Sequence, residues 1–186
     1  TYTAEVTYTL CNNSTIKLTD ETTVTVTGGK VWNGSVDTDW NKPANWTPNT
    51  SIPNDTDCVF IPNTVNKPIV SGTSYNALAG TLTVFANALL TINSNNSITV
   101  TNWVEVETNG TFLINNSASL VQINNAVNTG NIVYKRDAFV RSLDYVYWSS
   151  PVAGFNVSNI AAPLTAWGIY KWNTTIANPN GGQGNW

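Results

Sequence analysis

The sequence predicts an all-β protein whose centre is a short right-handed parallel β-helix with coils of about 22 residues, flanked by antiparallel strands of the β-sandwich type. Three observations lead to this fold class. Apolar and polar residues alternate along several short segments, one group of such segments repeats at a fixed period, and Asn, Thr and Ser supply most of the polarity. Thr favours strands and Asn favours turns, so neither supports helix. Only 10% of the 186 residues are charged, against about 25% in an average soluble domain.

The repeat runs from Leu82 to Ile123, and its period is the length of one expected coil. In each period three apolar pairs mark three short strands, and Asn, Ser, Gly and Ala lie between them, as tight corners require. Three short strands cannot bury a core alone, but stacked coils can, which favours a β-solenoid over a β-sandwich with evenly spaced strands. The expected stacked pairs, about 4.8 Å apart, are Val84 with Val106, Ile92 with Ile114, and Ile98 with Leu120.

The repeat weakens on both sides of this segment. Before it, apolar residues can supply one further, less regular coil: Val59, Ile61, Ile69, Val70 and Leu78. After Ile123 the period fades. A short solenoid needs a cover at each end, because an open end exposes strand edges and core. The tryptophan-rich segment 30–57 is the candidate for the first cap.

The remaining segments complete the expected organisation. Residues 1–29 alternate with period two and are expected to be strands of an upstream Ig-like or β-sandwich module. The cap (30–57) and the solenoid (58–134) follow. Residues 135–186 contain aromatic strand patterns and are expected to begin a further, jelly-roll-like β-sandwich module that is truncated.

Several runs of sequence resemble a known group of proteins. They are WNGSVDTDWNKPANW (32–46), VFIPN (59–63), NTGNIVYKR (128–136), YVYWSSPV (145–152) and YKWN…NGGQGNW (170–186). Their order is similar to that in large surface proteins of Flavobacterium and related Bacteroidota, which are exported by the type IX secretion system and are mostly described as adhesin-like or gliding-associated. The resemblance implies an extracellular or cell-surface location after export across the outer membrane.

The expected function is therefore a non-catalytic structural and adhesive segment of a large secreted or cell-surface protein. Its expected partners are other domains of the same polypeptide. One alternative is a carbohydrate-binding region of a secreted polysaccharide-degrading enzyme, with glycans as partners. Another is a filament subunit that joins a neighbouring copy by β-strand addition. The net charge of −3 without a basic stripe argues against nucleic acid. The absence of a long apolar run argues against membrane insertion.

Catalysis has few candidate residues in this sequence. The chain has no histidine and no Cys-x-x-Cys, which excludes His-based triads and the usual zinc sites. Glu105 and Glu107 flank the inward-facing Val106, so their Cβ atoms are expected about 6.5–7 Å apart on one strand, near the carboxylate separations of glycosidases. A solvated strand face explains this pair better, and we expect no catalytic residue.

Two acidic turns have the Asp-x-Asp spacing of calcium loops. Asp55 and Asp57 are the better candidates for a structural calcium, because the tight turn before Val59 would orient them; Asp37 and Asp39 are the other pair. Neither turn has a glutamate that closes the loop, and capping of the turn by the aspartate side chains explains both equally well. No other cofactor is expected.

Cysteines and tryptophans complete the candidates. A bridge between Cys11 and Cys58 would close a loop of about 47 residues, worth roughly 4 kcal/mol on the chain-entropy model. Two separate thiols, or pairing of Cys11 with an upstream cysteine, are the alternatives. Three tryptophans of the cap, Trp32, Trp40 and Trp46, are candidates for stacking on a glycan, whereas most aromatic side chains of this size are core.

Overall fold

The structure is a computed structural model that describes residues 2–9, 15–22, 29–139, 141, 155–156 and 172–185. The chain divides into two compact units, Thr1–Asp137 and Ala138–Trp186. In the described residues all regular structure is β apart from one 3₁₀ turn, η1 (Pro43–Asn45), which confirms the all-β prediction. No helix among these residues is long and apolar enough to cross a membrane.

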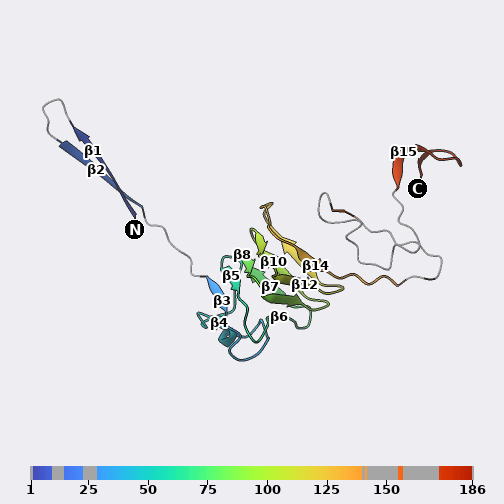
Figure 1. Cartoon of the computed structure of the whole chain (residues 1–186), viewed down its shortest axis with the longest axis horizontal. Coiled ribbons are helices and arrows are strands. Elements are labelled where there is room, and N and C mark those ends of the chain that lie inside the picture. Colours follow the sequence, from blue (N-terminus) through green and yellow to red (C-terminus); the bar gives the residue numbers. More distant parts are fainter. Residues whose placement is uncertain are drawn as a thin grey trace. The chain divides into compact units, whose positions relative to one another are not determined.

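The first unit contains a parallel β-solenoid (Figure 1). In the described part of the chain, three complete coils each contribute one strand to each of three sheets, which we name sheets I, II and III. These strands, coil by coil, are β5 (Cys58–Ile61), β6 (Ile69–Val70) and β7 (Asn76–Ala79); β8 (Thr81–Val84), β9 (Leu89–Ile92) and β10 (Ser97–Val100); and β11 (Val104–Val106), β12 (Thr111–Ile114) and β13 (Ser119–Gln122).

Partial coils extend the stack at both ends. At the N-terminal end, β3 (Lys30–Trp32) pairs in parallel with β5, and the short β4 (Trp46–Thr47) pairs with β3 in the antiparallel sense. At the C-terminal end, β14 (Ile132–Tyr134) pairs in parallel with β12, and Thr129 forms an isolated bridge with Glu105. Sheet I therefore has the order β11-β8-β5-β3-β4, sheet II β14-β12-β9-β6, and sheet III β13-β10-β7. Because β3 lies in segment 30–57, the cap and the solenoid share a sheet.

The predicted register is confirmed in all three sheets. Val106 pairs with Val84, Ile114 with Ile92, and Leu120 with Ile98, each between parallel strands. The less regular earlier coil is also present, since Val59 pairs with Leu82 and Val70 with Ile92. One residue of that coil differs from its expected place. Leu78 points outward and is half-buried, while Ala77 and Ala79 on either side of it fill the core.

A single core runs along the inside of the coils. Inward-facing positions are fully buried in successive coils, among them Val59, Leu82, Leu90, Ile98 and Phe112. Each such residue stacks on its counterpart one coil away, at the strand spacing of about 4.8 Å. The coils therefore bury jointly the apolar surface that a single coil would expose.

The corners between strands repeat with the same period. Asn87 and Asn109, which occupy the same position in successive coils, both have positive φ, as do Asn95 and Ser117. Asn tolerates this left-handed conformation better than most residues. Side chains also bond from coil to coil: Asn124 Nδ2 donates to Asn102 Oδ1 at 2.8 Å. The Asn-rich composition thus supplies the corners that the solenoid requires.

The other described strands form two small antiparallel pairs. At the N-terminus β1 (Tyr2–Thr9) pairs with β2 (Thr15–Thr22) along the whole length of both strands. In the second unit β15 (Asn173–Ala177) pairs with β16 (Gln183–Asn185). Residues 23–28, which belong to the predicted strand segment 1–29, lie outside the described residues, as do residues 145–152 and 167–171 of the predicted aromatic strand patterns. The bounds of the four predicted segments stay predictions.

Candidate functional site

The tryptophans of the cap form the closed end of the core. Trp32, Trp40 and Trp46 are each 0% exposed. Trp46 packs edge-to-face against both others, with ring centroids 5.1 Å from Trp32 and 4.6 Å from Trp40. These rings have no free face on which a sugar could stack, so the predicted glycan contact at these residues is corrected to a core role. Their size and their place beside the first coil explain the burial.

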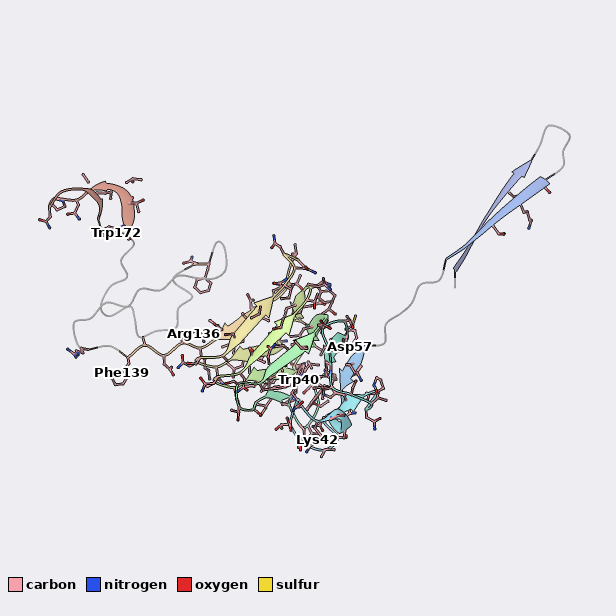
Figure 2. The ribbon with its side chains drawn as sticks, turned by 180° about the vertical axis from the view of Figure 1, so that it is seen from behind. Trp40, Lys42, Asp57, Arg136, Phe139 and Trp172 are labelled. Carbon is pink, nitrogen blue, oxygen red and sulfur yellow. The ribbon has the colours of Figure 1, made fainter. Side chains whose placement is uncertain are left out.

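Hydrogen bonds fix two of the three indoles. Trp32 Nε1 donates to the carbonyl of Asn66 at 2.8 Å, and Trp46 Nε1 donates to the carbonyl of Trp40 at 2.9 Å. Trp40 Nε1 is buried and has no partner among the described residues. The cap is thus held by specific polar contacts as well as by apolar packing. Figure 2 shows Trp40 and Lys42 in the part of the molecule where η1 and β4 lie.

A buried amide organises the loop of the cap. The Asn45 side chain is fully buried, and its Oδ1 accepts from the backbone N–H groups of Val36 and Asp37 at 2.9 and 3.1 Å. Its Nδ2 donates to Asp37 Oδ1 at 2.7 Å and to the carbonyl of Asp39 at 3.0 Å. All four hydrogen-bonding positions of the amide are therefore filled.

Asp37 has donors on both carboxylate oxygens. Lys42 donates to Oδ2, while Asn45 and the backbone N–H of Asp39 donate to Oδ1. The hydrogen bond from Lys42, followed by those from Asn45 and Asp39, lowers the pKa of Asp37 from 3.8 to about 2. The ammonium group of Lys42 thus takes the position beside Asp37 that a calcium ion would need, which supports the turn-capping alternative for this turn.

The second acidic turn is also held by its own side chains. Asp57 Oδ2 accepts from the backbone N–H of Asn54 at 2.9 Å, and Asn54 Oδ1 accepts from the backbone N–H of Thr56 at 2.8 Å. Asp55 is exposed, and its carbonyl accepts from Thr101 Oγ1 at 2.6 Å. No cluster of three or more acidic or thiol side chains that could hold a metal occurs in the described residues. The calcium at Asp55 and Asp57 stays a prediction.

Lys30 is a buried cation that the sequence reading did not single out. Its side chain is 5% exposed, and Nζ donates to the carbonyls of Pro48 and Ser51 at 3.0 Å each. It therefore ties the first strand of the solenoid to the loop after β4 through backbone oxygens. Alternation along β3 places residue 30 on the same face as Trp32, and this was the one signal for its burial.

The structure describes one of the two cysteines. Cys58 begins β5, is half-buried and forms no disulfide with any described residue. Cys11 lies outside the described residues, so the bridge between them stays a prediction.

The two glutamates of the solenoid differ in environment. Glu105 is half-buried on the outer face of sheet I, where it pairs with Thr83. Glu107 is exposed, and its Oε2 accepts from the backbone N–H of Ala86 at 2.9 Å, across the corner of the preceding coil. Glu107 thus caps a corner, while Glu105 stays on the strand face.

The outer face of sheet I carries aromatic residues that the sequence reading passed over. Phe60 and Phe85 have nearly parallel rings, with centroids 6.0 Å apart and an interplanar angle of 13°. Trp103, one residue before β11, is 37% exposed. Between them lie Thr81 and Thr83, only 9% and 4% exposed although they point outward. The alternation of each strand already predicts that Phe60, Phe85 and Trp103 point outward. Because the three residues do not occupy equivalent positions in successive coils, the repeat does not show that they share one surface.

The C-terminal end of the stack is open in the described part of the chain. Ile132 and Tyr134 pair with the buried Phe112 and Ile114, yet they are 37% and 41% exposed. Arg136 places its guanidinium 3.6 Å from the centre of the Tyr134 ring and donates to the carbonyl of Ala118 at 2.9 Å. A shallow, mainly polar cavity of about 260 Å³ lies near the last corner, lined by Val106, Glu107, Thr108, Asn109, Gly110, Gly130 and Asn131.

Fold and site together define a parallel β-solenoid closed at its N-terminal end by a tryptophan cap. Residues 31–186 match a domain of unknown function, DUF8693, and the chain belongs to this family. No curated protein and no solved structure matches the chain.

Proposed function

We propose that this chain is a non-catalytic structural and adhesive segment of a larger secreted or cell-surface protein. The observation that carries the proposal is the three-sheet bonding of the middle coil. Strand β8 lies between β5 and β11, β9 between β6 and β12, and β10 between β7 and β13. Every strand of that coil is bonded on both sides, so bending the stack there breaks backbone hydrogen bonds in at least one sheet. Such a rod suits the display of binding surfaces at a fixed spacing.

The chemistry of the described residues supports a non-catalytic role. Of the two glutamates on sheet I, Glu107 is engaged at a corner. Of the acidic turns, one is neutralised by Lys42 and the other is closed by Asn54 and Asp57. A general acid at neutral pH needs a carboxyl group whose pKa is raised by burial or by a neighbouring carboxylate. Among the described carboxyl groups, Asp37 has a pKa that its hydrogen-bond donors lower, which is the opposite direction.

The location is tested by labelling intact cells of the source organism with an antibody raised against residues 29–139. We expect labelling of intact cells, with lysed cells as the control for total protein. Labelling that requires lysis would contradict the surface location. The adhesive role is tested by deleting residues 58–134 from the parent gene. We expect export to continue and attachment to surfaces to fall, whereas unchanged attachment would contradict the role.

The non-catalytic role is tested by incubating the purified chain with a panel of polysaccharides and measuring new reducing ends. We expect none above the level of a heat-unfolded sample. Turnover that disappears in Glu105→Gln would overturn this part of the proposal.

A second candidate is assembly with a neighbouring copy by strand addition, and the open end favours it. Strand β13 pairs with β10 on one side and has no strand partner on the other within the residues described. An unpaired strand edge can accept an added strand. Sedimentation over a hundredfold range of concentration tests it: we expect association that Val121→Pro weakens, since proline interrupts strand pairing. A monomer at every concentration would contradict it.

A further inference from the structure

The outer face of sheet I forms three rows that run along the stack. The central row contains Val31, Phe60, Thr83, Glu105 and Thr129, each paired with the next across neighbouring coils. On one side lie Cys58, Thr81 and Trp103, and on the other Phe85 and Glu107. Neighbouring coils are about 4.8 Å apart and neighbouring rows about 6.6 Å apart. We call this surface the sheet I face.

Aromatic rings cover the polar floor of this face. Thr81 and Thr83 point outward but are almost fully buried, and Thr81 Oγ1 has no hydrogen-bond partner among the described residues. The register places Trp103 beside Thr81, and Phe60 beside Thr83. The Phe60 ring also packs over Gly29, where an added Cβ would lie 2.6 Å from Cε2 of the ring. The face therefore presents aromatic rings with hydroxyl groups beneath them.

The charge of the face restricts its ligand. Glu105 and Glu107 are its charged residues, and none of the lysines and arginines in the described ranges belongs to the three rows. Lys30, the basic residue nearest in sequence, is directed to the carbonyls of Pro48 and Ser51. An acidic ligand would be repelled by the carboxylates. A neutral ligand rich in hydroxyl donors fits, because a carboxylate only accepts hydrogen bonds.

The size of the face separates a glycan from a protein partner. The three rows span about 13 Å and the five positions of the central row about 19 Å, which gives roughly 250 Å² from the strand spacings. A stable protein interface needs about 800 Å² on each partner. A short stretch of a linear polysaccharide needs far less, and the apolar faces of its rings can lie on aromatic side chains.

We propose that the sheet I face binds a neutral linear polysaccharide, which crosses the three rows diagonally with its sugar rings on Trp103 and the Phe60–Phe85 pair and with hydroxyl groups donating to Glu105. This inference deepens the proposed function, on which it rests, by naming the ligand class of the adhesive surface. The residues that it assigns to glycan contact lie on the surface, whereas the three cap tryptophans are buried.

The test measures binding of the purified chain to soluble hexasaccharides by calorimetry. The neutral probes are β-1,4-glucan, β-1,3-glucan, β-1,4-mannan and β-1,4-xylan hexamers, and the acidic probe is a polygalacturonate hexamer. We expect at least one neutral probe to bind, and the acidic probe to bind at least tenfold more weakly. We expect Trp103→Ala to weaken the neutral probe at least tenfold, Trp103→Phe to retain most of the affinity, and Glu105→Gln to weaken it severalfold.

Phe139→Ala is the matched control, because Phe139 is a fully exposed aromatic residue outside the three rows. It should leave the affinity unchanged, and circular dichroism should show that every variant keeps its fold. No binding of any neutral probe at millimolar concentration, or equal binding by wild type and Trp103→Ala, would overturn the inference. If the chain self-associates and Trp103→Ala abolishes this association, the sheet I face binds a second copy of the chain and not a polysaccharide. None of these results depends on surface location or attachment, so the inference and the proposed function can fail separately.

Discussion

The two ends of the coil stack are built differently. At the N-terminal end three tryptophans, all fully buried, cover the first coil, and the antiparallel β4 lies on the edge of sheet I. At the C-terminal end the inward positions of the last partial coil, Ile132 and Tyr134, keep more than a third of their surface exposed. In the described part of the chain, large buried side chains therefore cover the core at the N-terminal end but not at the C-terminal end. Growth of the stack is blocked at the cap, whereas the other end still offers apolar surface and strand edges.

Replacing Trp46 by alanine should have the largest effect, because Trp46 contacts both other tryptophans of the cap. We expect a loss of about 3–5 kcal/mol in the free energy of unfolding, as for other buried aromatic residues. Urea denaturation followed by circular dichroism measures it. Phe139→Ala is the control and should change stability by less than about 0.5 kcal/mol. A loss below about 1 kcal/mol for Trp46→Ala, far under the usual cost of such a truncation, would show that the cap does not close the core.

Replacing Asn45 by alanine should have the next largest effect. The substitution leaves the backbone N–H groups of Val36 and Asp37 without their acceptor. We expect a loss of roughly 1–3 kcal/mol, the cost of unsatisfied buried polar groups. Asn45→Asp sharpens the comparison, because it keeps an acceptor but places a second carboxylate beside Asp37. It should destabilise at neutral pH and recover part of the loss in acid, and an unchanged pH profile would contradict this account.

A matched pair of isoleucines tests the open end. Ile114 is fully buried in sheet II, and Ile132 lies on the neighbouring strand β14 at 37% exposure. We expect Ile114→Ala to cost about 2–5 kcal/mol, and Ile132→Ala about 1 kcal/mol or less, because its side chain is already partly in water. Equal losses, measured by the same urea titration, would mean that something covers Ile132 in solution.

The smallest effect should appear as a pH dependence of the cap. The pKa of Asp37 is about 2 in the folded chain and 3.8 without its partners. The stabilisation from ionised Asp37 is therefore complete above pH 3.8, is lost as the pH falls through about 2, and is absent below that. Asp37→Asn should flatten the stability profile in this window, measured by urea titrations between pH 2 and 5. Because the ion pair with Lys42 is exposed, added salt should weaken the dependence in the wild type. If the stability of Asp37→Asn fell by the same amount between pH 5 and pH 2, the pH dependence would come from other carboxylates.

The coils could be predicted from the sequence because identical environments recur. Val84 and Val106 occupy the same position in successive coils, so the same residue type fits both, and the period is visible in one sequence. The position of the cap could be predicted from the sequence, but its contacts could not. Each of its contacts occurs once, and no pattern indicates that Trp40 is buried or that Lys30 donates to distant carbonyls. The sheet I face was missed for a related reason. Its aromatic residues belong to three coils, and only the register brings them together.

The constancy of register has a consequence for how such a chain can change length. The stretch of chain from Val59 to its partner Leu82 is longer than the stretch from Asn76 to its partner Ser97, yet both pairs keep their inward and outward order. The corners therefore absorb single insertions and deletions, while the strands do not tolerate them, since a shift of one residue turns the inward set outward. A tandem duplication of residues 82–103 would add one coil that matches both neighbours and would lengthen the stack by about 4.8 Å. The cap, the open end and their attached segments would be unchanged, so gene duplication can adjust the reach of this protein in fixed steps.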